Sequence, residues 1–160
     1  MWNFTFTIDM KIFWVLLGIV GIAALSGAGF VMSKMDSVIE VMAKAIQAFE
    51  GGKPGDRNMR NNNPGNIRWE PPLPQWLIDR GAIGKDSGNH VIFATFDQGY
   101  AELKRQLRLA FTGQSDNFYP SMSLYEYFAK YAEANQKPYA ERVASALGVD
   151  PSTTLEELIS

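Results

Sequence analysis

Apolar residues are spread unevenly along the 160-residue chain, which contains a continuous, charge-free apolar run over residues 12–32. In the remainder, apolar positions recur every three or four residues, which is the period of an amphipathic helix. The first such series consists of Val38, Met42, Ala45, Ile46 and Phe49. Asp36 or Ser37 can cap this predicted helix at its start. Gly51-Gly52 ends it directly after Glu50.

Further series with the helical period predict three or four more helices in the second half of the chain. Two have clear start signals, because Ser123–Glu126 has the pattern of a capping box and Thr153–Glu156 resembles one. Two have clear ends, because Gly113 and Gly148 follow the last apolar position of their series. The expected helices lie near residues 100–111, 124–131, 138–147 and 155–159.

Two short runs, Ile67–Glu70 and Val91–Phe96, predict strands that pair as a small hairpin. The segment between them is rich in proline and glycine, which indicates a loop. Helices combined with one small sheet make an α+β domain that is mainly helical.

The apolar run has the length of a transmembrane helix, since about 20 apolar residues cross a bilayer core. A secretory signal peptide is the alternative, because Ser26-Gly27-Ala28 resembles a cleavage site. Continuation of the run through Phe30-Val31-Met32 and the scarcity of basic residues before it favour a retained span. We therefore expect three parts, an N-terminal flank (1–11), a transmembrane anchor (12–34) and a globular domain (35–160).

Composition narrows the chemistry available to the globular domain. The chain has no cysteine, which excludes disulfide frameworks, thiolate nucleophiles and cysteine-ligated zinc. We interpret the single histidine, His90, as a structural or surface residue, and we expect no metal or organic cofactor. The formal net charge of −2 disfavours a nucleic-acid partner. Carboxylates remain as the side chains that could carry catalysis.

Glu50 is the carboxylate best placed for such chemistry. The helix dipole disfavours negative charge at the C-terminal end of a helix, and a general acid must carry a proton. The following segment, Arg57–Trp69, is rich in asparagine and arginine, whose side chains can hydrogen-bond the hydroxyl and acetamido groups of a sugar. Its tryptophan offers an indole face that suits a sugar ring. The same composition also suits a polar loop that stabilises its own turns, and both interpretations stay open.

Five sequence blocks between about residues 38 and 158 follow one another in a characteristic order. The most specific is Arg60-Asn61-Asn62-Asn63-Pro64-Gly65-Asn66-Ile67-Arg68. The other four are Ala45–Gly51, Phe93–Tyr100, Tyr119–Leu124 and Tyr139–Val149. Together they resemble a lysozyme-like family of phage and bacterial proteins that cleave peptidoglycan.

The resemblance implies a lysozyme-like domain that cleaves the β-1,4 bond between N-acetylmuramic acid and N-acetylglucosamine. Glu50 falls on the family's catalytic glutamate, and Tyr139, with Tyr131 as a second candidate, would line the cleft. The substrate-binding positions expected in the asparagine block are Asn61, Asn62, Asn63, Asn66 and Arg68. Glu70 and Asp97 are candidates for a second carboxylate, although Asp97 is more readily explained as a helix N-cap. Neither stands out, which favours a lytic transglycosylase over a two-carboxylate muramidase.

Two classes of function follow from these expectations. The first is a membrane-anchored enzyme that degrades peptidoglycan, held by a single span in a virion membrane or a bacterial inner membrane. The second is a non-catalytic, membrane-anchored virion structural or wall-binding protein that keeps the lysozyme-like fold. The expected partners are peptidoglycan glycan strands, the lipid bilayer through residues 12–32, and other virion or envelope membrane proteins.

Overall fold

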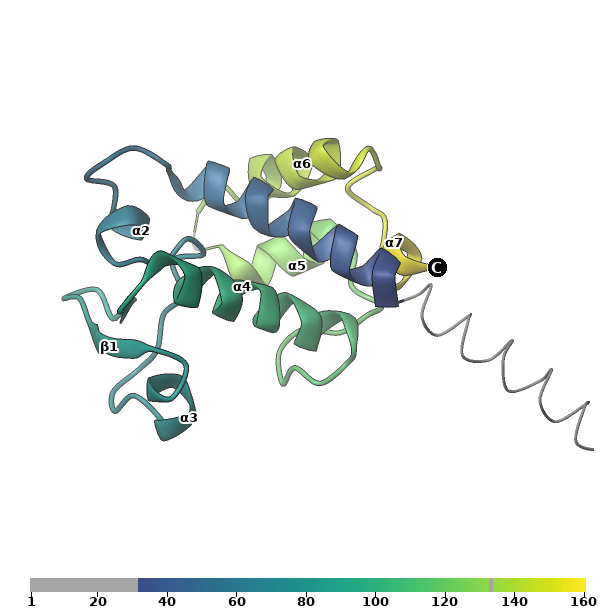
Figure 1. The fold of residues 1–160 in the computed structure, drawn as a ribbon. Coiled ribbons are helices and arrows are strands. Elements are labelled where there is room, and N and C mark those ends of the chain that lie inside the picture. The colour runs from purple at the N-terminus through teal and green to yellow at the C-terminus, as the bar shows by residue number, and fades with distance from the viewer. Residues whose placement is uncertain (1–31, 133) are drawn as a thin grey trace, which may run out of the picture. The chain divides into compact units, whose positions relative to one another are not determined.

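The helical pattern of the sequence appears in the computed structural model, which describes residues 32–132 and 134–160 (Figure 1). The first described element is a helix at residues 32–50, which we call the Glu50 helix. The remaining elements are α2 (Arg57–Arg60), α3 (Gln75–Ile78), β1 (Ala82–Lys85), β2 (Val91–Phe93), α4 (Phe96–Phe111), α5 (Leu124–Tyr131), α6 (Gln136–Leu147) and α7 (Leu155–Ile159). The expected mixture of helices and one small sheet is therefore confirmed.

Cap signals in the sequence mark several helix ends correctly. Ser123 caps α5 by accepting a hydrogen bond from the Glu126 backbone N–H, while the Glu126 side chain accepts one from the Ser123 N–H. Gly148 ends α6 in the left-handed conformation, with a φ of 71°. The capping box of α7 uses Thr154 and Glu157, one residue later than expected.

The start of the Glu50 helix differs from the expectation. Asp36 and Ser37 lie inside the helix, which is already helical at residue 32. Asp36 instead forms an ion pair with Arg108 of α4. Its carboxylate therefore links two helices and does not cap one.

The small sheet is an antiparallel hairpin of β1 and β2. The expected second strand is confirmed over Val91–Phe93, but the expected first strand, Ile67–Glu70, is wrong. That segment contributes a single bridge between Arg68 and His90. Two prolines follow Glu70 directly and lack the backbone N–H that a longer ladder needs. Ala82–Lys85, in the expected loop, pairs with β2 in its place.

The hydrophobic core lies among the longer helices of Met35–Ser160, which forms one structural unit. Figure 1 shows the Glu50 helix running between α6 above it and α4 below it, with α5 behind, and α5 packs directly against α6. The fully buried side chains include Ile39, Met42, Ile46, Leu103, Leu107, Phe128 and Tyr139. Each buried side chain of this size contributes about 1.5–3 kcal/mol. This packing fixes the C-terminal end of the Glu50 helix on the same side of the unit as α2 and the hairpin.

The expected transmembrane helix needs correction. Within residues 32–132 and 134–160, no helix combines the length and the apolar character that a membrane crossing requires. The described Glu50 helix has charged side chains in successive turns, at positions 34, 36, 40, 44 and 50. This finding contradicts the expected anchor and the single-pass membrane location that depended on it. Apart from Met32, the residues of the expected span, 12–32, lie outside the described part of the chain.

Candidate active site

The Glu50 carboxylate is held by side chains from two other segments of the chain. Its Oε2 accepts a hydrogen bond of 2.6 Å from the Asn66 amide nitrogen Nδ2. Its Oε1 accepts a hydrogen bond of 3.0 Å from the Tyr139 hydroxyl group. Asn66 belongs to the asparagine-rich loop and Tyr139 to α6. Three segments that are far apart in the sequence therefore converge on one half-buried carboxylate.

The chain turns sharply after Glu50, and this turn places the carboxylate at the end of its helix. Gly51 has a φ of 120°, which residues with a side chain rarely adopt. A Cβ atom at Gly51 would lie 2.7 Å from Oδ2 of Asp56. The buried Asn58 donates a hydrogen bond of 2.6 Å from Nδ2 to the Gly51 carbonyl oxygen. The first part of the loop therefore anchors the chain directly after the C-terminal end of the Glu50 helix.

Glu50 lines a cavity of about 320 Å³ that is mostly polar. Five of the residues expected at the site border it: Glu50, Asn66, Arg68, Tyr131 and Tyr139. Glu50 is its only carboxylate among the described residues. Asn66 Oδ1 is buried and has no hydrogen-bond partner within the described part of the chain. A buried amide oxygen in that state can accept a hydrogen bond from a ligand.

The two tyrosines provide a rigid wall beside Glu50. The Tyr139 ring stacks on Phe49, with centroids 4.0 Å apart, and on Phe128, with centroids 4.5 Å apart. The Tyr131 hydroxyl donates a hydrogen bond of 2.7 Å to the Gly65 carbonyl oxygen. Burial, followed by repulsion from Tyr131 and Glu50, raises the pKa of Tyr139 far above its ordinary value. Tyr139 therefore keeps its proton and acts as a hydrogen-bond donor to Glu50.

The other three expected asparagines bind within the protein itself. Asn61 donates to Asp86 Oδ2 at 2.9 Å, and Asn62 donates to the Phe93 carbonyl oxygen at 3.0 Å. Asn63 is fully buried and donates to the Ile67 and Val91 carbonyl oxygens at 2.9 and 2.8 Å. None of the three lines the Glu50 cavity. In this structure they hold the loop against the hairpin, which is the second of the two interpretations that the sequence left open.

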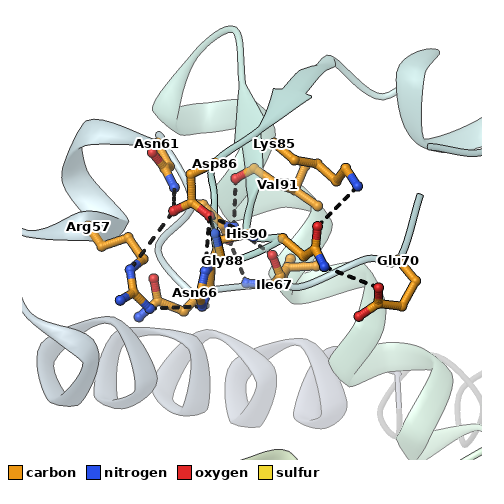
Figure 2. Close-up of polar contacts among 12 residues, drawn as sticks. Arg57, Asn61, Asn66, Ile67, Glu70, Lys85, Asp86, Gly88, His90 and Val91 are labelled. Carbon is orange, nitrogen blue, oxygen red and sulfur yellow. Dashed lines mark hydrogen bonds and ion pairs between the residues drawn. The ribbon is translucent and has the colours of Figure 1, made fainter. Parts of the chain in front are cut away.

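Neither candidate for a second carboxylate reaches the Glu50 cavity. Glu70 is exposed and accepts a hydrogen bond of 3.1 Å from the Asn89 amide. Figure 2 places Glu70 at the opposite end of the polar cluster from Arg57. Asp97 is exposed in the first turn of α4, and the N-cap of that helix is Thr95 rather than Asp97.

Arg57 and His90 also line the Glu50 cavity, and neither was assigned to the site from the sequence. Arg57 Nη1 lies 2.9 Å from His90 Nε2, and His90 Nδ1 lies 3.3 Å from Asp86 Oδ1. Figure 2 shows Asp86 at the centre of this group, reached by Asn61, Arg57 and His90. Arg57 lies in the polar segment that the sequence singled out, whereas nothing in the sequence connects His90 to it across 33 positions.

A second cavity of about 460 Å³ lies next to the first, because Arg68 lines both. Its walls include Trp69 and Trp76, whose rings meet edge to face with centroids 5.3 Å apart. The guanidiniums of Arg80 and Arg105 lie 5.2 and 4.9 Å from the Trp76 ring. These contacts hold the aromatic wall in place.

Comparisons with protein families, with curated proteins and with solved structures find no match for this chain. The similarity to the lysozyme-like family therefore stays a prediction. Within the described residues, no group of three or more histidine, aspartate or glutamate side chains is arranged to hold a metal ion. The geometry itself offers a carboxylate with two hydrogen-bond donors, facing a polar cavity that a ligand could enter. Such a group can exchange a proton with a bound ligand.

Proposed function

We propose that this protein cleaves the β-1,4 glycosidic bond between N-acetylmuramic acid and N-acetylglucosamine in peptidoglycan, with Glu50 as the catalytic acid. The observation that carries the proposal is the Glu50 carboxylate, held by Asn66 and Tyr139 at the wall of a polar cavity. The arginines and amides of that cavity suit the hydroxyl, acetamido and carboxylate groups of peptidoglycan. The resemblance of the five sequence blocks to the lysozyme-like family supports the same assignment.

The proposed reaction uses Glu50 twice. Protonated Glu50 first gives its proton to the glycosidic oxygen, and the bond between that oxygen and the muramyl C1 breaks. The resulting Glu50 carboxylate then accepts the proton of the muramyl 6-hydroxyl, whose oxygen bonds to C1. This sequence returns the proton to Glu50 and leaves a 1,6-anhydro product.

Among the described residues that line the cavity, Glu50 is the single carboxylate, which favours this lytic transglycosylase route over hydrolysis with two acids. Two-carboxylate glycosidases place their acids about 5–10 Å apart across the scissile bond. Glu50 has no such partner among the described residues that line its cavity. Attack by the substrate's own hydroxyl requires no second acid in the protein, because the nucleophile is already attached.

The test uses the full chain, purified peptidoglycan sacculi and three proteins. Wild type should release soluble muropeptides, and Glu50→Gln, which keeps the shape but removes the acid, should release at least a hundredfold less. Glu70→Gln is the matched control, because Glu70 is an exposed carboxylate outside the cavity, and its activity should equal that of wild type. Sacculi that bind wild-type protein without releasing products would show a non-catalytic wall-binding protein instead.

Mass spectrometry of the same digest decides between the two enzyme classes. The proposed route leaves 1,6-anhydromuramyl ends, which are lighter than reducing ends by one water molecule. A digest in which reducing ends dominate would show a muramidase, with water rather than the 6-hydroxyl as the nucleophile.

A further inference from the structure

Asp86 is the inner end of a series of polar side-chain contacts that leads into the Glu50 cavity. Its Oδ1 accepts hydrogen bonds from the backbone N–H groups of Gly88, at 2.9 Å, and His90, at 3.0 Å. Its Oδ2 accepts one of 2.9 Å from the Asn61 amide. Burial alone would raise the pKa of Asp86, but the hydrogen bonds from Asn61, His90 and Gly88 outweigh it and lower that pKa. Asp86 therefore stays ionised at neutral pH.

His90 connects Asp86 to Arg57, and the chemistry of arginine fixes the direction of the bonds. A guanidinium can only donate, so His90 Nε2 must accept from Arg57 Nη1 across 2.9 Å. The ring proton then lies on Nδ1, which is 3.3 Å from Asp86 Oδ1. The His90 side chain is only 9% exposed, which restricts its rotation. The result is a series of hydrogen bonds in which Arg57 donates to His90 and His90 donates to Asp86 (Figure 2).

The outer end of this chain presents a positive group to the cavity. Arg57 is the first residue of α2. Its side chain is 51% exposed and lines the cavity together with Glu50. Its Nε also lies 3.9 Å from Asp86 Oδ2, which orients the guanidinium plane. Of five N–H donors, one is used by His90 in a direct hydrogen bond. The Nε–H faces Asp86, and the remaining donors on Nη1 and Nη2 can form a paired contact with a carboxylate. Arg68, on the same cavity, adds a second positive charge.

We propose that Arg57 is a specificity-determining residue that binds a carboxylate of the muramyl substituent, and that His90 and Asp86 are positioning residues that hold it. This inference rests on the proposed function. Muramic acid differs from glucosamine by a lactyl group, which ends in a carboxylate or carries a peptide that has its own carboxylates. A fixed guanidinium beside Glu50 would distinguish peptidoglycan from an uncharged chain of N-acetylglucosamine.

The decisive experiment compares a change in the protein with a matching change in the substrate. Arg57→Gln removes the charge from an exposed side chain, and coupling the substrate carboxylates to ammonia as amides removes their charge. On native peptidoglycan, Arg57→Gln should lower kcat/KM about tenfold or more. On the amidated substrate, wild type should already show that loss and Arg57→Gln should add none. Equal losses from Arg57→Gln on both substrates would overturn the inference.

Matched variants separate charge, geometry and position. Arg60→Gln changes another arginine of α2 that does not line the cavity, and it should leave kcat/KM unchanged on both substrates. Arg57→Lys keeps the charge but loses the paired geometry, so it should recover only part of the wild-type value. Asp86→Asn should lower kcat/KM on native peptidoglycan and not on the amidated substrate. A loss from Asp86→Asn on both substrates would show a merely structural role.

Two further arms identify the carboxylate and keep the inference separate from the proposed function. Glycan strands freed of peptide by an amidase retain only the lactyl carboxylate, so an Arg57 effect that persists on them assigns that group. An effect that disappears assigns the peptide carboxylates. Glu50→Gln should abolish turnover on every substrate, unlike Arg57→Gln. If wild type shows no turnover, the proposed function fails, and cosedimentation of the same proteins with native and amidated sacculi still tests the Arg57 contact.

Discussion

Asn63 and Asn66 lie three positions apart in one loop, yet they serve different purposes. The Asn63 side chain makes three hydrogen bonds, donating to Ile67 and Val91 and accepting at Oδ1 from the Ile67 N–H. Asn66 directs its amide nitrogen to Glu50. Its backbone is left-handed, with a φ of 47°, a conformation that asparagine tolerates better than most residues. Asn63 therefore stabilises the loop, whereas Asn66 holds the Glu50 carboxylate.

This division predicts opposite effects of two alanine substitutions. Asn63→Ala leaves two buried carbonyl groups without these donors, so the free energy of unfolding should fall by about 2–4 kcal/mol. Asn66→Ala should change that free energy by less than about 1 kcal/mol, because its lost partner is a half-exposed side chain. It should nevertheless reduce muropeptide release about tenfold. Denaturant unfolding and the sacculus assay, run on both variants, measure the two effects.

The opposite pattern would contradict the assignment of these residues. If Asn66→Ala unfolds the protein while Asn63→Ala loses only activity, the loop faces the ligand through Asn63. The sequence alone could not separate the two, since amides of identical chemistry stand in one turn-rich run. What decides between them is which amide meets the backbone of β2 and which meets Glu50, and both contacts join residues at least 16 positions apart.

At the scale of the elements, the features that the sequence predicted correctly are helix ends determined by residues within one turn. The capping box at Ser123 and the glycine at position 148 act within one helical turn, and both are present in the structure. Asp36 carries the same kind of signal, but its carboxylate pairs with Arg108, 72 positions away, and the helix continues through it. β1 was missed for a similar reason, because its pairing with β2 decides its conformation more than its own four residues do.

Gly99 of α4 shows how closely that helix approaches the asparagine loop. A Cβ atom at Gly99 would lie 1.9 Å from the Asn62 carbonyl oxygen, which belongs to the backbone and cannot swing aside. Within a helix, alanine is otherwise favoured over glycine by about 1 kcal/mol. Gly99→Ala should nonetheless lower the free energy of unfolding by about 1–3 kcal/mol, since the collision outweighs the helix preference.

Gly84 provides the matched control for this prediction. A Cβ atom at Gly84 of β1 meets nothing within 4 Å, so Gly84→Ala should change the free energy of unfolding by less than about 0.5 kcal/mol. Denaturant unfolding of both variants measures the difference between them. A Gly99→Ala protein at least as stable as wild type would show that α4 does not rest on the loop as described, and the support of the Asn66 segment would need another explanation.

At the scale of the whole molecule, the two neighbouring cavities fit the proposed function best if the ligand is a glycan strand that reaches beyond one sugar. Glu50 lines one cavity, the tryptophan pair lines the other, and Arg68 belongs to both. Trp69 is 36% exposed, and its ring meets that of Trp76 edge to face. The guanidiniums of Arg80 and Arg105 both contact the Trp76 ring. Under the proposed function, an indole held in this way can stack on a sugar ring beyond the one at Glu50.

If one strand occupies both cavities, Trp69→Ala should weaken action on long substrates selectively. For native glycan strands kcat/KM should fall about fivefold, which corresponds to a loss of about 1 kcal/mol. For a tetrasaccharide too short to reach the second cavity, kcat/KM should be unchanged. Tyr125→Ala removes an aromatic ring of equal exposure that lies in neither cavity, and it should alter neither value. Equal losses on long and short substrates would place the effect of Trp69 at the Glu50 cavity itself, and the strand would then have to leave the site by another path.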